Sequence, residues 1–164
     1  MLPVFARDTH VVFVMPEVAR SFYTDMTYGL KYFSYVADEL PRICRDVFRI
    51  SARREDTAVM GASMGGYGAL KCALSRPEQY GSCCAFSSAC LFLKDFLEGE
   101  GRHRDVQALR ATYGVQLVTD FQAAFGEDLA SNPRNDLLAL AESISGTLIK
   151  PRIYCTCGTE DDLR

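Results

Sequence analysis

The sequence has no long apolar run and no block of charge of one sign. Its 18 Lys and Arg residues against 21 Asp and Glu residues give a net charge of −3, spread along the chain. A nucleic acid or an anionic membrane surface therefore finds no basic patch to bind. The chain also lacks the run of about 18 apolar residues that spans a bilayer and the N-terminal pattern of a signal peptide. We expect a cytoplasmic protein that binds neither nucleic acid nor membrane.

The seven cysteines are odd in number and scattered. This distribution argues against a disulfide framework and predicts reduced, mostly buried thiols. Cys155 and Cys157 are one residue apart in an apolar run, but no second Cys or His pair stands at zinc spacing. We therefore expect no metal site and no cofactor. A chain of 164 residues is about the length of one domain.

One serine stands between a strand signal and a helix signal. Residues 58–60 form a short apolar run, and residues 66–74 take up helical spacing. Gly61 and Gly65 lie two positions to either side of Ser63, which is the G-x-S-x-G pattern of a nucleophile on a sharp turn. We expect a side chain at either glycine to collide with the neighbouring strand or helix. The Met64 N–H would then face the charge that develops on a substrate carbonyl oxygen.

Strand and helix signals alternate along the rest of the chain. Residues 11–15 are a β-branched run that predicts a buried strand, and further strands are expected at 83–87 and 148–157. Residues 28–48 carry helical spacing with Pro41 in its path, which predicts a kink or a helix that restarts there. The alternation predicts an α/β fold with a mostly parallel sheet.

Residues 91–147 carry a different pattern. Amphipathic helical segments at 106–113, 121–125 and 137–144 are separated by Gly, Asn and Pro residues. Because this stretch lies between two strand signals, we expect it to form a small helical cap inserted into a single domain that covers residues 1–164.

A serine nucleophile needs a base, usually histidine, that is oriented by a carboxylate. In α/β-hydrolases the chain order is serine, acid, histidine, each after a sheet strand. Asp161 follows the last strand signal and is the candidate acid, with Asp162 and Glu160 as rivals and a solvated acidic turn as the alternative. The two histidines, His10 and His103, are expected in structural or surface positions, so a base is missing.

Distinctive sequence blocks run through almost the whole chain. They are residues 14–17, 20–24, 28–29, 39–41, 54–57, 61–71, 77–78 and 157–161. On these blocks the chain resembles the esterase D / tributyrin esterase group of α/β-hydrolases, which includes the S-formylglutathione hydrolases. The resemblance implies a carboxylesterase that acts on short acyl esters, with Ser63 as nucleophile, Asp161 as triad acid and a small-molecule ester as partner.

Two family segments have no counterpart in the sequence. One is an N-terminal His-Gly loop that supplies a second oxyanion donor, and the other is a C-terminal segment with the catalytic histidine. We therefore expect an incomplete α/β-hydrolase domain that is nearly inactive alone, with Met1 an internal position and Arg164 a premature end. Outer strands and a last helix would be missing, so exposed apolar faces and self-association, including a homo-oligomer, are expected.

Four residues are candidates to line the substrate site: Arg20, Ser21, Tyr23 and Tyr67. The loop after a parallel strand opens on the same side as the serine turn, although packing of the aromatic rings into the core is the alternative. Lys71 is expected to be an ordinary surface lysine. Two other functions stay open, a thioester hydrolase acting on S-formylglutathione and a non-catalytic binding domain.

Overall fold

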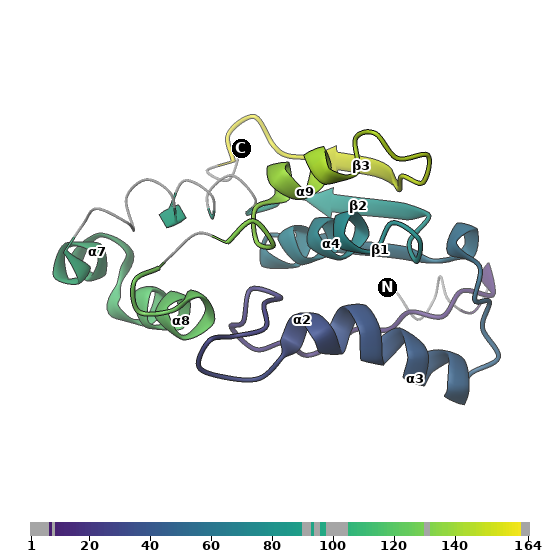
Figure 1. Cartoon of the computed structure of the whole chain (residues 1–164), viewed down its shortest axis with the longest axis horizontal. Helices are drawn as coiled ribbons and strands as arrows, with labels where there is room; N and C mark the ends of the chain where they lie inside the picture. Colours follow the sequence, from purple (N-terminus) through teal and green to yellow (C-terminus); the bar gives the residue numbers. More distant parts are fainter. Residues whose placement is uncertain are drawn as a thin grey trace.

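The computed structural model describes residues 7, 9–89, 93, 96–97, 105–129 and 132–161. Three parallel strands form its sheet, in the order β1 (Ala58–Ala62), β2 (Ser82–Phe86) and β3 (Arg152–Thr156) (Figure 1). The strands are in register, with Met60 opposite Cys84 and Cys84 opposite Tyr154. The predicted parallel sheet is therefore confirmed for these strands. β3 begins one residue after Pro151, because proline has no N–H for the ladder.

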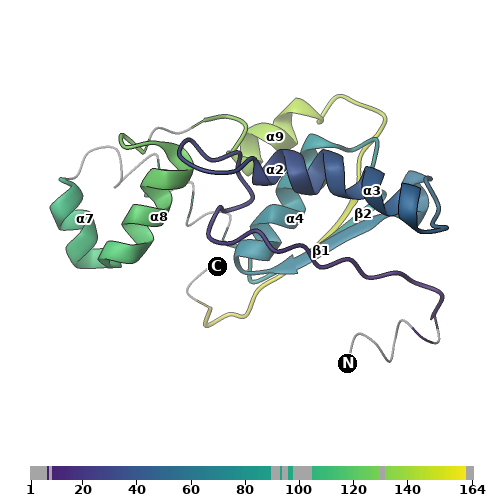
Figure 2. The ribbon, with the colours of Figure 1, turned by 90° about the horizontal axis from the view of Figure 1, so that it is seen from below.

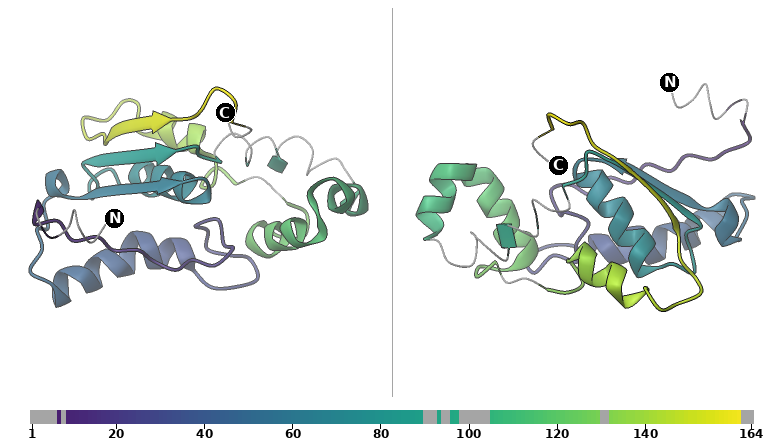
Figure 3. Two further views of the ribbon diagram at one scale, coloured as in Figure 1. Left: turned by 180° about the vertical axis from the view of Figure 1, so that it is seen from behind. Right: turned by 90° about the horizontal axis from the view of Figure 1, so that it is seen from above.

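Helices cover one face of this sheet. In chain order the helical elements include α2 (Tyr32–Ser34), a π-helical turn η1 (Tyr35–Glu39), α3 (Leu40–Val47), α4 (Met64–Ser75), α7 (Val106–Tyr113), α8 (Val115–Phe125) and α9 (Leu137–Ser143), and not all of them lie on the sheet. Figures 2 and 3 show α2, α3, α4 and α9 on the same side of the strands, with α7 and α8 extending away from the sheet. α4 is the central helix, because every residue from Gly66 to Leu74 is buried.

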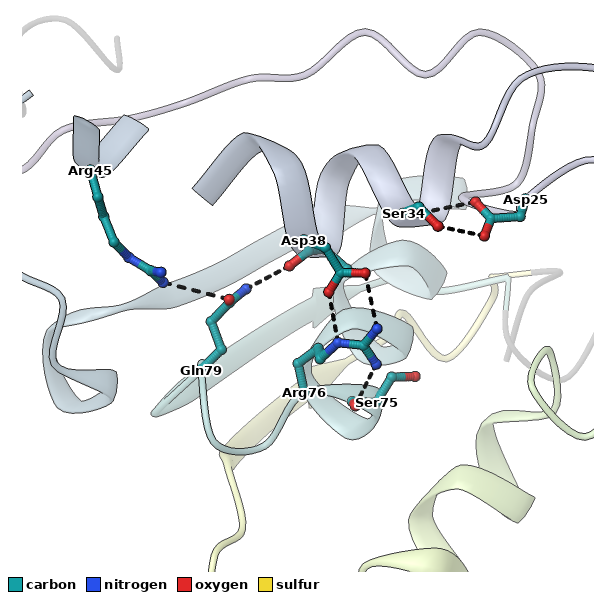
Figure 4. Close-up of polar contacts among 8 residues, drawn as sticks. Asp25, Ser34, Asp38, Arg45, Ser75, Arg76 and Gln79 are labelled. Carbon is teal, nitrogen blue, oxygen red and sulfur yellow. Dashed lines mark hydrogen bonds and ion pairs between the residues drawn. The ribbon is translucent and has the colours of Figure 1, made fainter. Parts of the chain in front are cut away.

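The helix predicted over residues 28–48 is interrupted just before Pro41. Proline has no N–H to donate to Ala37, four residues earlier, and the π-helical turn lies at this point. The Ala37 carbonyl accepts a hydrogen bond of 2.9 Å from Nε2 of Gln79. Asp38 accepts two more, of 2.8 and 3.0 Å, from the guanidinium of Arg76 (Figure 4). The disturbance that Pro41 predicts is therefore present as a π-helical turn between α2 and α3, and polar contacts hold this turn against the end of α4.

The helices expected within residues 91–147 are present where the structure describes this stretch. α7 has the predicted bounds, and α8 begins earlier than predicted, directly after Gly114. Asp105 and Asp136 cap α7 and α9 by accepting hydrogen bonds from backbone N–H groups. Gly114 and Gly126 end α7 and α8 at φ of 87° and 100°, a conformation that favours glycine.

The strand predicted at residues 11–15 is wrong. This segment runs along the β1 side of the sheet without regular secondary structure, and it forms no strand pairing (Figure 2). Val12 and Met15 are 52% and 76% exposed, so the segment is not buried either. A β-branched run indicates a preference for extended backbone, but a strand also needs a partner to accept its hydrogen bonds.

Among the residues described, none of the helices is long and apolar enough to cross a membrane.

Apolar side chains lie on the face of the sheet that the helices leave uncovered. Met60, Phe86 and Tyr154 are 55%, 37% and 59% exposed, and the rings of Phe86 and Tyr154 lie 6.3 Å apart. Exposed apolar patches of this kind favour association.

We expect the purified 164-residue chain to associate in a concentration-dependent way in light scattering after gel filtration. Replacing Met60 and Tyr154 by lysine should shift it towards the monomer. The matched control replaces Val115 and Leu138, which are equally exposed on helices, and should change nothing. A sharp monomer peak for the wild type at all concentrations would contradict the prediction.

Candidate functional site

Ser63 occupies the turn between β1 and α4. Its backbone has φ 53° and ψ −122°, which costs a residue other than glycine about 1–3 kcal/mol. Three backbone hydrogen bonds hold it there: its N–H donates to Phe86 O at 3.0 Å, and its carbonyl accepts from Tyr67 N at 3.1 Å and Ala89 N at 3.3 Å. The strained turn is therefore fixed by β2 and by the segment that follows β2.

The Ser63 side chain remains exposed and does not cap α4. A serine at the start of a helix usually uses its hydroxyl to satisfy backbone N–H groups. Here the backbone turns the hydroxyl away from that role, so Oγ is available for chemistry. Met64 is the first residue of α4, and its N–H has no partner one turn earlier in the helix. The positive end of the helix dipole thus begins beside the hydroxyl.

At Gly61, β1 and the first turn of α4 approach closely. A Cβ on Gly61 would lie 2.2 Å from the Gly65 carbonyl oxygen, so the expected collision is confirmed at this position. A Cβ on Gly65 would meet only the Tyr23 hydroxyl, at an ordinary 3.7 Å. The expectation for Gly65 is therefore wrong. It is the carbonyl oxygen of Gly65 that lies against Gly61, whereas the space around the Cα of Gly65 has room for a Cβ.

Asp161 lies in the turn that follows β3, and its N–H donates to Gly158 O at 3.2 Å. The pKa of the Cys157 thiol is raised, first by desolvation and then by the charge of Asp161 and a hydrogen bond to it. The Asp161 carboxylate therefore lies beside Cys157 at the carboxyl end of β3. Its rival Glu160 is exposed, and Asp162 lies outside the described residues.

Ser63 and Asp161 lie at the same edge of the sheet, because both follow the carboxyl ends of parallel strands. β2 lies between them, so the two strand ends are about 10 Å apart. A third group has to bridge this gap. His10 is exposed in a segment that enters at the opposite end of the sheet (Figure 3), and His103 lies outside the described residues.

One candidate tyrosine, Tyr67, belongs to α4, and the other, Tyr23, packs against this helix. Tyr67 is fully buried, and its hydroxyl donates to Asn135 O at 2.9 Å, so its ring belongs to the core. Burial also raises the pKa of its phenol. Tyr23 is partly exposed and lies across the first two turns of α4, since a Cβ on Gly68 would be 2.3 Å from its ring. Of the two, only Tyr23 presents surface next to the Ser63 turn.

Arg20 and Ser21 have different surroundings. Arg20 forms a 2.9 Å ion pair with Asp120 on α8 and lines an open hollow of about 690 Å³, formed by residues 17–32 and α8. The lining of the hollow includes the apolar side chains of Met26 and Leu30 and the ring of Tyr32. Ser21 is fully buried, so its side chain lines no open surface.

Lys71 is not a surface lysine, which corrects the sequence expectation. Its side chain is 2% exposed, and Nζ donates to Tyr23 O at 2.9 Å, Thr24 Oγ1 at 3.0 Å and Asn135 Oδ1 at 2.7 Å. Burial lowers its pKa to about 8. The sequence held a signal: Lys71 is the one charged residue of α4, and a helix that is apolar all round is buried.

The cysteines that the structure describes divide equally between buried and accessible positions. Cys44, Cys72 and Cys83 are buried, and burial raises the pKa of Cys72 and Cys83 to about 12, which keeps these thiols protonated. Cys84 is partly exposed, and Cys155 and Cys157 are exposed. The prediction that the thiols are mostly buried is therefore wrong for the described cysteines. In the described part of the chain, no three His, Cys, Asp or Glu side chains are placed to hold a metal ion.

Comparison with known proteins identifies related sequences. The model of the Esterase family matches residues 8–164. An acetyl esterase of Caldicellulosiruptor saccharolyticus is 31% identical over 157 residues, covering 94% of this chain and 56% of that protein. An S-formylglutathione hydrolase of Bos taurus is 43% identical over 74 residues, covering 42% of this chain and 26% of that protein. The chain thus spans about half the length of the acetyl esterase.

Solved structures share the fold. The serine hydrolase FphF of Staphylococcus aureus, which binds fluorophosphonates, has a TM-score of 0.67 and 24% identity, over 88% of this chain and 51% of that one. The S-formylglutathione hydrolase FrmB of Staphylococcus aureus has a TM-score of 0.59 and 22% identity, over 88% and 51%. These likenesses confirm the α/β-hydrolase fold that the sequence predicted.

The two glycines of the turn should respond oppositely to alanine. Gly61→Ala forces a Cβ into the Gly65 carbonyl, so we expect a loss of several kcal/mol or no folded protein at all. Gly65→Ala, the matched control, has room and should melt within a few degrees of the wild type. Thermal unfolding followed by circular dichroism measures both. Equal melting temperatures for the two variants would contradict the prediction.

Lys71 should make stability depend on pH. Its folded pKa, about 8, lies below the unfolded value of 10.5, so between these values the unfolded chain binds more protons and the free energy of unfolding rises with pH. Burial is the largest cause of the lowered pKa, and the charge of Asp25, which raises it, offsets burial only in part. The buried phenols and thiols act in the opposite direction, because their pKa values are raised.

Comparison with Lys71→Met isolates the lysine. From pH 7.5 to 9.5 the free energy of unfolding of the wild type, minus that of the variant, should rise by about 2 kcal/mol. Urea unfolding at low protein concentration measures this difference. Lys31→Met, at an exposed lysine, should show no such trend. A flat difference for Lys71→Met would mean that the ammonium keeps its ordinary pKa.

Proposed function

The chain belongs to the Esterase family, and from this premise we propose that it carries the nucleophile and the acid of a serine carboxylesterase that hydrolyses short-chain acyl esters. One observation carries the proposal. Ser63 is held at positive φ by three backbone hydrogen bonds, with its side chain exposed and not used to cap the helix. Strain of this kind at a reactive side chain is typical of nucleophiles on a strand-to-helix turn.

In the proposed mechanism a histidine takes the proton of Ser63 Oγ as this oxygen attacks the carbonyl carbon of the ester, and it gives the proton to the departing alcohol. Water, deprotonated by the same histidine, then hydrolyses the acyl-enzyme and frees Ser63. The Met64 N–H donates to the oxyanion that forms in each step, supported by the N-terminus of α4. Arg20, Ser21, Tyr23 and Tyr67 were the predicted substrate-binding residues. Exposure supports Tyr23 beside the nucleophile and Arg20 in the hollow, and it does not support Ser21 and Tyr67, which are buried.

Asp161 would act through a histidine. The strand ends that carry Ser63 and Asp161 are about 10 Å apart, which an imidazole hydrogen-bonded to both can bridge. The family order places this histidine after Asp161, so neither His10 nor His103 is our candidate. We therefore propose that residues 1–164 are part of one α/β-hydrolase domain, with residues 91–147 as its cap, and that the base comes from the coding sequence beyond Arg164.

A thioester substrate is the second candidate. The chain shares 43% identity with an S-formylglutathione hydrolase over 74 residues, a local likeness higher than that to the acetyl esterase. Ester and thioester hydrolysis use the same nucleophile and oxyanion donors. Rates with acetyl, butyryl and S-formylglutathione substrates would decide between them.

The test uses two proteins, the 164-residue chain and the protein expressed with all the coding sequence that its gene carries on either side. We expect the longer protein to hydrolyse p-nitrophenyl acetate and to be labelled at Ser63 by a fluorophosphonate probe. Ser63→Ala should abolish labelling and lower kcat about 10⁴-fold or more. The 164-residue chain alone should hydrolyse the ester near the background rate.

Matched variants in the β3 turn test the acid. Asp161→Asn should lower kcat about 10³-fold or more, whereas Glu160→Gln, at the neighbouring carboxylate, should leave it within about twofold. A larger loss in Glu160→Gln would move the acid to that residue. If the longer protein folds but is neither labelled nor active, the esterase proposal is wrong and a non-catalytic binding domain replaces it.

A further inference from the structure

Lys71 is a buried charge in the helix that follows the nucleophile. Lysine is almost never fully buried unless it is paired, and no carboxylate pairs with it at ion-pair distance within the described residues. Instead its three donors meet three acceptors, namely Tyr23 O, Thr24 Oγ1 and Asn135 Oδ1. The donor capacity of the ammonium is therefore fully used by neutral groups.

Aromatic rings complete the surroundings of this ammonium. Nζ lies 5.0 Å from the centroid of the Phe33 ring and 5.7 Å from that of Tyr67. Ring faces attract a cation, and the attraction grows when water is excluded. Rings and acceptors come from three separate stretches of the chain, so the fold builds this site specifically for a cation.

Two of the three acceptors, Tyr23 O and Thr24 Oγ1, belong to a strained turn at residues 22–24. Phe22 and Tyr23 have φ of 50° and 49°, two consecutive left-handed residues without glycine. Such backbone persists only where surrounding contacts hold it. Thr24 Oγ1 donates to Phe22 O at 3.1 Å and accepts from Lys71 Nζ. The ammonium is therefore linked to Phe22 through the threonine hydroxyl and to Tyr23 directly.

The strained turn places Tyr23 on the elbow helix. Its ring packs on Gly68, and its hydroxyl lies 3.7 Å from where a Cβ of Gly65 would be. Gly65 is two residues after Ser63, so the position of Tyr23 decides what borders the first turn of α4.

Asn135 is held by the same face of α4. Lys71 Nζ binds its side-chain oxygen, and the hydroxyl of Tyr67, one helical turn earlier, binds its backbone carbonyl. Asp136, the N-cap of α9, follows directly. A single face of α4 therefore joins the 22–24 turn to the start of α9.

We propose that Lys71 is a positioning residue for the nucleophile: its ammonium holds the strained 22–24 turn and Asn135 against α4 and so keeps Tyr23 in place beside Ser63. The link to Ser63 rests on the proposed function, whereas the hold on the turn does not. Lys71 contacts neither Ser63 nor Asp161, so it acts through Tyr23. A buried, unpaired ammonium does not stabilise a fold by its charge, so a role in geometry explains it better than a role in stability.

The first test measures amide hydrogen exchange in the 164-residue chain. The reporters are Thr24 N–H, which donates to Ser21 O, and Met26 N–H, which donates to Leu30 O; the reference is Gly81 N–H, which donates to Thr57 O. We expect Lys71→Met to speed exchange at the reporters about tenfold or more and to change the reference less than about twofold. Lys31→Met is the matched control and should change neither.

Thr24 supplies a rescue pair. Thr24→Val removes one acceptor of Lys71 and should loosen the same reporters, while Thr24→Ser keeps the hydroxyl and should restore slow exchange. Equal acceleration at reporters and reference would assign Lys71 a merely structural role and overturn the proposal. No acceleration at the reporters would overturn it as well.

The second test measures the rate of fluorophosphonate labelling at Ser63 in the longer protein. Lys71→Met and Gly68→Ala, which pushes a Cβ into the Tyr23 ring, should each slow labelling about tenfold at an unchanged folded fraction. Gly146→Ala, where a Cβ meets open space, is the control and should match the wild type. Unchanged labelling in Lys71→Met would overturn the role for Ser63. If the wild type itself is not labelled, the proposed function fails, and the exchange measurement alone decides the role of Lys71.

Discussion

The contact between Gly61 and the Gly65 carbonyl is the constraint on which the rest of the molecule depends. Only hydrogen fits on Gly61, because a Cβ would lie 2.2 Å from that oxygen. This close approach lets the chain reverse from β1 into α4 through a single strained residue, Ser63. The direction of α4 across the sheet follows from the same turn, and with it the face on which the other helices pack. Fold and candidate chemistry thus share one steric requirement.

Local patterns predicted the elements that depend on neighbouring residues. The elbow, the interruption at Pro41 and the helix ends at Gly114 and Gly126 follow from restrictions that each residue imposes on its own backbone. The candidate acid was likewise placed by chain order, since a residue after a parallel strand lies at a known edge of the sheet. These predictions needed no knowledge of distant contacts.

Predictions that depend on a distant partner were less successful. Residues 11–15 have strand composition, yet strand formation also depends on pairing, which composition does not specify. The left-handed backbone of Phe22 and Tyr23 could not be predicted, because neither residue is a glycine and the contacts that hold this backbone come from α4. Lys71 looked like a surface residue because lysine usually is one, although its apolar neighbours on both sides in the helix favoured burial.

The segments around Ser63 are connected mainly through α4. The 22–24 turn and the start of α9 are bound to its buried face through polar contacts, while β2 and the segment after β2 hold the Ser63 turn at its N-terminus through backbone hydrogen bonds. Polar contacts in a buried site are directional, so they fix positions more sharply than apolar packing does, which tolerates sliding. Asp161 follows β3, which pairs with β2. The nucleophile and the acid therefore share β2 as a common support, and the buried face of α4 adds polar contacts to the 22–24 turn and to the start of α9.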